Sequence, residues 1–171
     1  MTSPAEGPAT GKDTITIGGP IDEVRVSLCL YGDDLAPDEV TGLLGCEPTQ
    51  AARKGEPLIK KSRCRIRTLP SQQRVPSSRK PRISRIGVWI LSGEWSATDI
   101  EEQVSALLQR VSDDLAVWNQ LSRYRLKITC GLSLRAWNRG LELSSELLQQ
   151  LAARHLGLSF DIYCNCEDEE S

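Results

Sequence analysis

The chain has 171 residues, of which 39% are hydrophobic and 26% charged, and its formal net charge is −2. Such a chain is long enough to bury a core without disulfide or metal staples, which favours a single globular domain. No apolar run could span a membrane, and residues 1–22 lack the basic start and apolar stretch of a signal peptide. We therefore expect a soluble, cytoplasmic protein: a disordered leader at 1–22, one domain at 23–163 and an acidic tail at 164–171.

The first predicted unit is a strand followed by a short helix. From Val24 to Tyr31 apolar residues occupy every second position, which is the period of a strand with one buried face. Pro37 is suited to the first turn of a helix and Gly45 to its end. The sequence therefore predicts a strand at 24–31 and a helix between Pro37 and Gly45.

A second unit follows a long polar connection. Residues 86–91 alternate like a strand, with Trp89 on the side that faces away from the core. Apolar residues then recur at helical spacing, which predicts a helix over 100–115. Thr98 and Glu101 are placed to form its capping box.

The last unit is predicted to be strand, helix and strand. Alternation indicates strands at 126–135 and 158–163. Between them, Ser144 is a suitable N-cap of a helix and Gly157 a suitable end. His155 falls on the apolar side of this helix, which is more typical of a packed side chain than of a catalytic base.

These elements amount to four strands and three helices. Each strand has one apolar face, so the helices should cover one face of the sheet and leave the other open. We expect an α+β two-layer sandwich: a four-stranded, mostly antiparallel sheet with three helices on one face, in a ferredoxin-like arrangement.

Several short motifs together resemble a known family. They are Gly32-Asp-Asp-Leu-x-Pro37-Asp-Glu-Val40, Arg53-Lys54-Gly55, Gly87-x-Trp89 and Phe160-Asp161-Ile162-Tyr163. Across most of residues 24–163 the chain is thereby similar to a bacterial family catalogued as domain of unknown function 4279. The resemblance implies no activity, and the basic stretch from Arg53 to Arg85 looks longer than the family's usual connection.

Charge is distributed unevenly along the chain. Residues 53–85 hold 12 Lys and Arg and a single acid, Glu56, whereas the remainder holds 9 basic and 22 acidic residues. This basic insert therefore carries +11 on a body of −13. It could bind phosphate or nucleic acid, or it could be a solvated loop neutralised by the acidic body. The anion-binding candidates are Lys60, Lys61, Arg63, Arg65, Arg67, Arg79, Lys80 and Arg82.

The open face of the predicted sheet is a second candidate site. Its partner-binding residues would be Arg25, Tyr31, Trp89, Arg135, Asp161 and Tyr163. Aromatic and Arg side chains are enriched at the centres of protein interfaces, so this face is suited to binding another protein. If the chain ends or another subunit cover it, the same residues are merely packed.

A loop cluster of Asp33, Asp34, Arg53, Lys54 and Gly55 is the third candidate. Paired acids beside a strand end suggest a cation site or general acid/base chemistry. Turn and capping chemistry also explains such acids, and it is the simpler explanation because no third ligand follows at fixed spacing.

The cysteines and the missing motifs argue against catalysis. All six thiols are expected to stay reduced, and Cys164, Cys166 and His155 lack a fourth metal ligand, so we predict no metal and no cofactor. No nucleophile elbow, P-loop or H-E-x-x-H occurs, and we assign no catalytic residue. We therefore predict a non-catalytic protein-interaction module, such as a toxin-neutralising (immunity-type) or adaptor protein. The alternatives are nucleic-acid binding through the insert and a small enzyme with a site near Asp33 and Asp34 or using Cys164.

Overall fold

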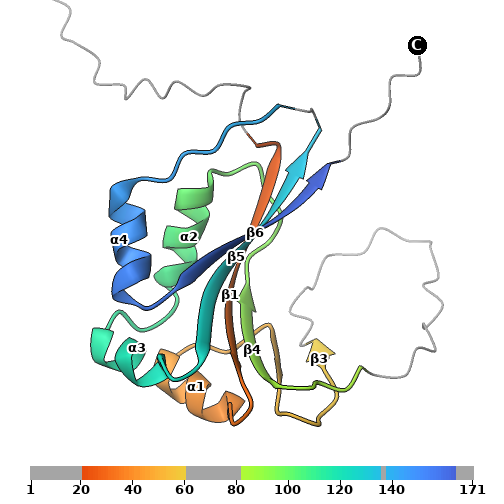
Figure 1. Cartoon of the computed structure of the whole chain (residues 1–171), viewed down its shortest axis with the longest axis vertical. Coiled ribbons are helices and arrows are strands. Elements are labelled where there is room, and N and C mark those ends of the chain that lie inside the picture. The colour runs from red at the N-terminus through yellow and green to blue at the C-terminus, as the bar shows by residue number, and fades with distance from the viewer. Residues whose placement is uncertain (1–20, 61–81, 136–137, 165–171) are drawn as a thin grey trace, which may run out of the picture.

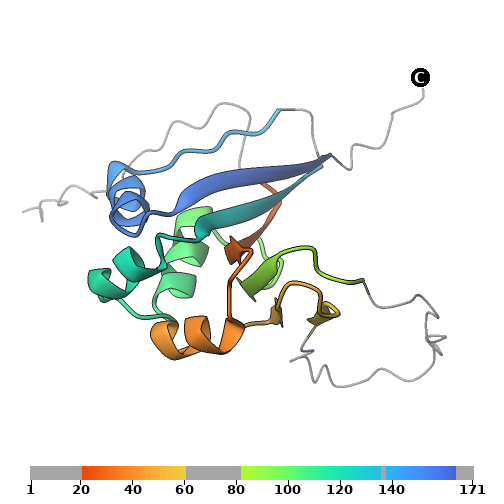
Figure 2. The ribbon, with the colours of Figure 1, turned by 60° about the horizontal axis from the view of Figure 1, so that its bottom comes forward.

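The computed structural model describes residues 21–60, 82–135 and 138–164. Within these residues one sheet carries four helices on a single face (Figures 1 and 2). The predicted α+β class is confirmed. The expectations for the leader and the acidic tail lie outside the described residues, apart from a residue or two where each adjoins the domain. None of the described helices has the length and apolar content to cross a membrane.

The strands lie in the order β3-β2-β4-β1-β5-β6. They are β1 (Glu23–Gly32), β2 (Gln50–Ala52), β3 (Ile59–Lys60), β4 (Gly87–Ser92), β5 (Arg125–Leu134) and β6 (Gly157–Cys164). Every neighbouring pair is antiparallel except β5 and β6, which are parallel. β1 is therefore central, with β5 beside it from Glu23 to Tyr31 and β4 on its other side from Ser27 to Gly32.

The sheet departs from the four-stranded, ferredoxin-like arrangement in two ways. β2 and β3 extend it beyond β4, and their three and two residues are too short to show a period in the sequence. In addition, β1 and β2 run in the same direction with β4 between them, whereas β5 and β6 are direct neighbours. The first β-α-β unit is thus split and the second is not.

The helices are one more than predicted in the described part of the chain. They are α1 (Pro37–Leu44), α2 (Ile100–Leu108), α3 (Leu115–Leu121) and α4 (Ser145–Ala153). The single helix expected over 100–115 is wrong, because α2 stops at Leu108 and Asp114 starts α3 by accepting a hydrogen bond from the Ala116 N–H at 2.8 Å. Asp99, not Thr98, caps α2.

The other helix ends show which sequence signals were decisive. Gly45 ends α1 with φ of 68°, and the Ser144 hydroxyl caps α4 by accepting from the Leu147 N–H at 3.2 Å, both as predicted. α4 ends before the expected Gly157, and His155 turns the chain with φ of 56°. His155 is exposed and hydrogen-bonded to Asn119 Oδ1 at 2.7 Å, so its predicted packing in the core is wrong.

Trp89 of β4 lies in the core and not on the open face. Its register partner is Leu30, which points towards the helices, and the indole is fully buried. The indole Nε1 donates to Thr41 Oγ1 of α1 at 3.0 Å. The predicted orientation is wrong because both sides of this strand are apolar, so alternation alone could not decide between them.

Candidate functional site

The face of the sheet without helices is called the open face here. On β1 it carries Arg25 and Tyr31, which alternate with the buried Val26, Leu28 and Leu30. The register of β6 places Asp161 and Tyr163 on the same face. Arg135 lies one residue after β5, with its guanidinium 3.7 Å from the Glu23 carboxylate. Of the six residues assigned to this face from the sequence, Trp89 is the one that lies elsewhere.

An exposed pair of aromatic rings lies at one end of the open face. Trp95, in the loop after β4, is 42% exposed and Tyr163 is 47% exposed. Their ring centroids are 6.1 Å apart and the ring planes meet at 74°, which is the favourable edge-to-face arrangement. We call Trp95 and Tyr163 the aromatic cluster.

Gly131 makes room for this cluster in the middle of β5. A Cβ atom at this position would lie 2.8 Å from Trp95 Cη2, so a larger residue would displace the indole. A glycine inside a strand often marks such a close approach. Sequence reasoning missed Trp95, and Gly131 within an otherwise regular strand was the signal that could have found it.

The loop that carries Trp95 is held from two sides. Val24 and Ser96 exchange backbone hydrogen bonds of 2.8 and 3.0 Å. From α2, the Gln103 amide donates to Val24 O, Ser96 Oγ and Thr98 O at 3.0–3.1 Å. The indole therefore projects from a loop that is fixed to both the sheet and a helix.

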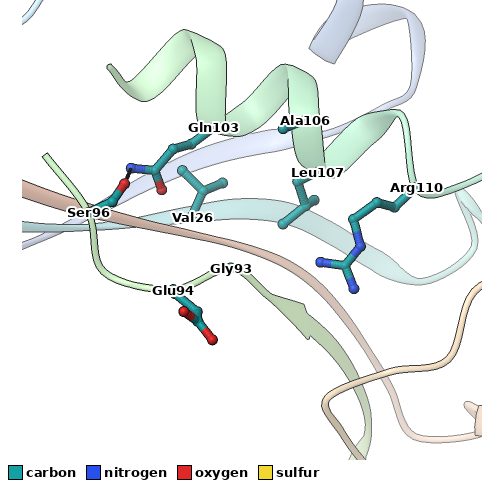
Figure 3. Close-up of a pocket in the computed structure, with 8 residues that line it drawn as sticks. All are labelled: Val26, Gly93, Glu94, Ser96, Gln103, Ala106, Leu107 and Arg110. Carbon is teal, nitrogen blue, oxygen red and sulfur yellow. Dashed lines mark hydrogen bonds between the residues drawn. The ribbon is translucent and has the colours of Figure 1, made fainter. Parts of the chain in front are cut away.

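Figure 3 shows the other side of this loop, where Gln103 points to Ser96 and Arg110 extends from the end of α2. A hollow of about 210 Å³ lies between α2 and the loop, with Val26 and Leu107 in its wall. Sequence reasoning did not anticipate it. Because the Gln103 amide is already hydrogen-bonded to the loop, the hollow offers a mainly apolar wall.

The surroundings of the aromatic cluster are polar. Glu23, Trp95, Ser133 and Tyr163 line a hollow of about 350 Å³. The Tyr163 hydroxyl donates to an Asp161 carboxylate oxygen, and this hydrogen bond together with the Asp161 charge raises the pKa of Tyr163, while Arg25 acts in the opposite direction. The phenol therefore remains protonated at neutral pH.

An ion pair fixes the segment that follows β5 beside the cluster. The Asp22 carboxylate accepts hydrogen bonds from the Arg135 backbone N–H at 2.9 Å and from Arg139 Nε at 3.1 Å. The bond from Arg139 is the main reason that the pKa of Asp22 lies below its ordinary value. Both side chains are largely shielded from solvent, unlike the other ion pairs of the described residues.

The remainder of the open face is less suited to an interface centre. In its middle, Ser27 Oγ donates to Ser92 Oγ at 2.9 Å, and small side chains predominate. At the far end, Lys127 Nζ lies 5.6 Å from the centroid of the Tyr31 ring, and burial raises the pKa of Tyr31. Exposed aromatic surface is therefore concentrated at the end that holds the aromatic cluster.

The predicted loop cluster is brought together, but as surface ion pairs. Lys54 Nζ is 3.1 Å from Asp33 Oδ1, and Arg53 Nη2 is 3.0 Å from Asp38 Oδ2, with every side chain solvent-exposed. Gly55 has φ of 84° and its N–H donates to Ser84 O at 2.8 Å. Asp34 is exposed. Exposed pairs of this kind contribute little, and turn chemistry accounts for the arrangement.

A hollow of about 340 Å³ lies beside this cluster without Asp33 or Asp34 in its wall. It is lined by Pro37, Asp38, Thr41, Glu47, Pro48, Ala51, Ala52, Arg53 and Glu56. Cys164, the other group considered for catalysis, pairs with Leu134 at the opposite end of the sheet from Asp33. The structure therefore does not bring together the groups of the small-enzyme hypothesis.

The described cysteines and acids form no metal site. No group of three or more His, Cys, Asp and Glu side chains in the described ranges could hold a metal ion. Cys29, Cys46 and Cys130 are free thiols, and burial raises the pKa of Cys130 to about 12. Cys164 is disulfide-bonded, which contradicts the expectation that every cysteine is reduced.

Most of the predicted anion-binding residues lie outside the described residues. Arg82 is described and exposed, and Lys60 belongs to β3. The backbone nevertheless shows how the insert joins the body. Leu58 N–H donates to Arg82 O at 2.8 Å, and Ser84 N–H donates to Glu56 O at the same distance.

Fold and site together define an α+β domain with helices on one face of its sheet and an aromatic cluster at one end of the other face. A family model described as Domain of unknown function (DUF4279) matches residues 22–165, a range that includes every described helix and strand. The chain belongs to this family, which confirms the resemblance seen in its motifs. Comparisons with curated proteins and with solved structures gave no match.

Proposed function

We propose that this protein is a non-catalytic module that binds another protein through the open face of its sheet, with the aromatic cluster at the centre of the contact. One observation supports this most: Trp95 and Tyr163 are both exposed and packed against each other on a face without helices. Trp, Tyr and Arg are the residues that most often dominate binding energy in protein interfaces.

The rigidity of the cluster favours binding. The loop of Trp95 is fixed by its hydrogen bonds, and the indole lies close against Gly131. The Tyr163 side chain is fixed by its hydrogen bond to Asp161. Side chains that are already fixed lose less conformational entropy when a partner binds. A fixed aromatic pair therefore yields more affinity than two mobile rings would.

Charges around the cluster indicate the kind of partner. A mixed polar rim is formed by Arg25, Arg135, Glu23 and Asp161, in which the Arg135 guanidinium lies 3.7 Å from the Glu23 carboxylate. Such a rim suits a protein surface with an apolar or aromatic anchor inside a polar border. In a bacterial cytoplasm, a module of this kind could neutralise a toxin or act as an adaptor.

The double variant Trp95→Ala/Tyr163→Ala is expected to reduce affinity for the partner at least about thirtyfold, because each hot-spot residue contributes about 2 kcal/mol or more. The partner is first isolated from source cells with the wild-type chain and then purified. Its affinity for each variant is measured by isothermal titration calorimetry.

Leu115→Ala/Leu148→Ala is the matched control, since both leucines are 47% exposed on helices. This control should bind like the wild type. If the aromatic double variant is folded and still binds with wild-type affinity, the open face is not the binding surface.

A second candidate function, nucleic-acid binding through residues 53–85, is favoured by the charge separation of +11 against −13. Electrostatic binding of this kind follows from phosphate neutralisation by Lys and Arg. The insert contains no Phe, Tyr or Trp, so stacking on bases would not contribute.

For this alternative we expect binding to mixed-sequence duplex DNA or RNA to weaken roughly a thousandfold between about 50 and 200 mM salt. Replacing residues 61–81 by a short Gly-Ser linker should abolish it. The hydrogen bonds from Leu58 N–H to Arg82 O and from Ser84 N–H to Glu56 O keep the two ends adjacent, so the body should fold without the insert. Fluorescence anisotropy measures both effects, and absence of binding at low salt would exclude this function.

A further inference from the structure

The sheet has one long edge strand and one very short one. β3, at one end of the sheet, has two residues, whereas β6, at the other end, has eight. β6 pairs with β5 on one side, and its other side has no strand beside it among the described residues (Figure 1). Such an edge presents a row of backbone donors and acceptors to any further strand.

Apart from the charge of Asp161, the usual protective features are missing from β6. Natural edge strands are kept apart by Lys side chains, proline, bulges or very short length. β6 reads Gly-Leu-Ser-Phe-Asp-Ile-Tyr-Cys, with no proline, no basic residue and a continuous register along β5. β3 is protected by its shortness, but β6 is not.

Exposed apolar side chains accompany this open edge. Phe160 is 40% exposed and Ile162 is 60% exposed, although both point to the helix side of the sheet, where residues of the inner strands are buried. Leu158 is partly buried against the core. A strand beside β6 would cover Phe160 and Ile162 as well as pair the backbone.

From these features we propose that β6 pairs antiparallel with β6 of a second copy of this chain, in a register centred on Phe160. This register places Leu158 opposite Ile162 of the second copy and Phe160 opposite its equivalent, so apolar side chains meet on the helix side. On the open face, Ser159 comes opposite Asp161, and Gly157 comes opposite Tyr163. Cross-strand pairs of these kinds stabilise a sheet, and an aromatic residue opposite a glycine covers the exposed backbone.

Charge supports this occupant and this register. A register centred on Asp161 would set two carboxylates directly opposite each other, which is destabilising. Centred on Phe160, the single carboxylate of the strand, Asp161, comes opposite Ser159 of the second copy in both halves of the contact, so no like charges meet. The strand is therefore compatible in charge with a second copy of itself.

A two-fold contact of this kind joins two copies and leaves no long edge strand for a third. Each copy offers one long edge, and pairing two of them leaves β3, which is short, at both ends of the joined sheet. The expected assembly is a dimer rather than a fibre. It leaves the open faces of both copies uncovered, with Tyr163 of each aromatic cluster beside the joined edge. The pairing is tested at Phe160 and Ile162 on the helix side, so it can fail separately from the proposed protein-binding function.

Sedimentation velocity of the full chain, from dilute to concentrated solution, tests this pairing. We expect a species of twice the 18.9 kDa chain mass for the wild type, and the single-chain mass for Phe160→Lys and for Ile162→Lys. Leu115→Lys, at an exposed leucine of α3, should remain dimeric. A wild type with single-chain mass at every concentration, or a dimer that survives in folded β6 variants, overturns the proposal.

Hydrogen–deuterium exchange of the wild type gives a second measurement that needs no variant. Amides of β6 should become more protected as concentration rises, while those of the α3 region should not change. Concentration-dependent protection elsewhere, with none in β6, would place the contact on another surface and contradict this inference.

Discussion

Replacing Trp89 by alanine is expected to lower the free energy of unfolding by about 3–5 kcal/mol, the usual cost of removing a large buried aromatic side chain. Trp89 is fully buried between the sheet and α1. The substitution empties this volume and also leaves Thr41 Oγ1 without the indole donor that lies 3.0 Å away. The surrounding strands are paired on both sides and cannot collapse to fill the cavity.

Urea unfolding, followed by circular dichroism, measures the loss. Trp95→Ala is the matched control, because the same residue type is removed from a partly exposed position. It should cost much less than Trp89→Ala. Equal losses in the two variants would contradict the buried position of Trp89.

Gly87→Ala is expected to destabilise the protein by about 1–3 kcal/mol or more, as overpacking of a tight site does. A Cβ atom at Gly87 would lie 2.7 Å from the backbone oxygens of Gly32 and Leu35, and 2.8 Å from Leu35 Cβ. Two of these three neighbours are main-chain atoms. The strand pair β1–β4 would therefore have to move apart at this point.

Gly42→Ala is the control for this prediction. A Cβ atom at Gly42 would meet nothing within 4 Å, and the position lies inside α1. Alanine there should stabilise the protein by about 0.5–1 kcal/mol, because glycine is the poorer helix former. A Gly87→Ala variant as stable as the wild type would contradict the close approach of β1, β4 and the loop after β1.

The strands that could be predicted correctly from the sequence are those in which every second residue is apolar and the residues between them are polar. β1 and β5 read unambiguously because their apolar residues alternate with polar ones, and both strands were placed to within a residue or two. The position of β4 was predicted, but its buried and open faces were exchanged. Val88 and Ile90 on one side of the strand are as apolar as Trp89 and Leu91 on the other. Only the pairing with β1 decides which side meets the helices.

Other features depended on contacts between distant segments. The break between α2 and α3 is set by Asp114, an N-cap that sits inside a continuous apolar period. β2 exists because β4 borders it, and its three residues carry no signal of their own.

The candidate site shows the same division. Arg25 and Tyr163 could be assigned to the open face because they lie in regular strands. Trp95 lies in a loop, where no period indicates direction, and its place over Gly131 arises from residues 36 positions apart in the chain. The alternation of apolar and polar residues therefore could not predict that Trp95 belongs to the aromatic cluster.

The central position of β1 has a consequence for the nascent chain. β1 leaves the ribosome first, yet its partners are far along the sequence: Ser27 meets Ser92, and Cys29 meets Thr129 one hundred residues later. At about 5–20 residues per second, synthesis of that stretch takes roughly 5–20 s. Until it is complete, the apolar side chains of Val26, Leu28 and Leu30 lie on a strand that lacks β5 on one side. The central strand of the folded protein is thus the one that stays longest without its neighbouring strands during synthesis. A chaperone would be needed most at this strand.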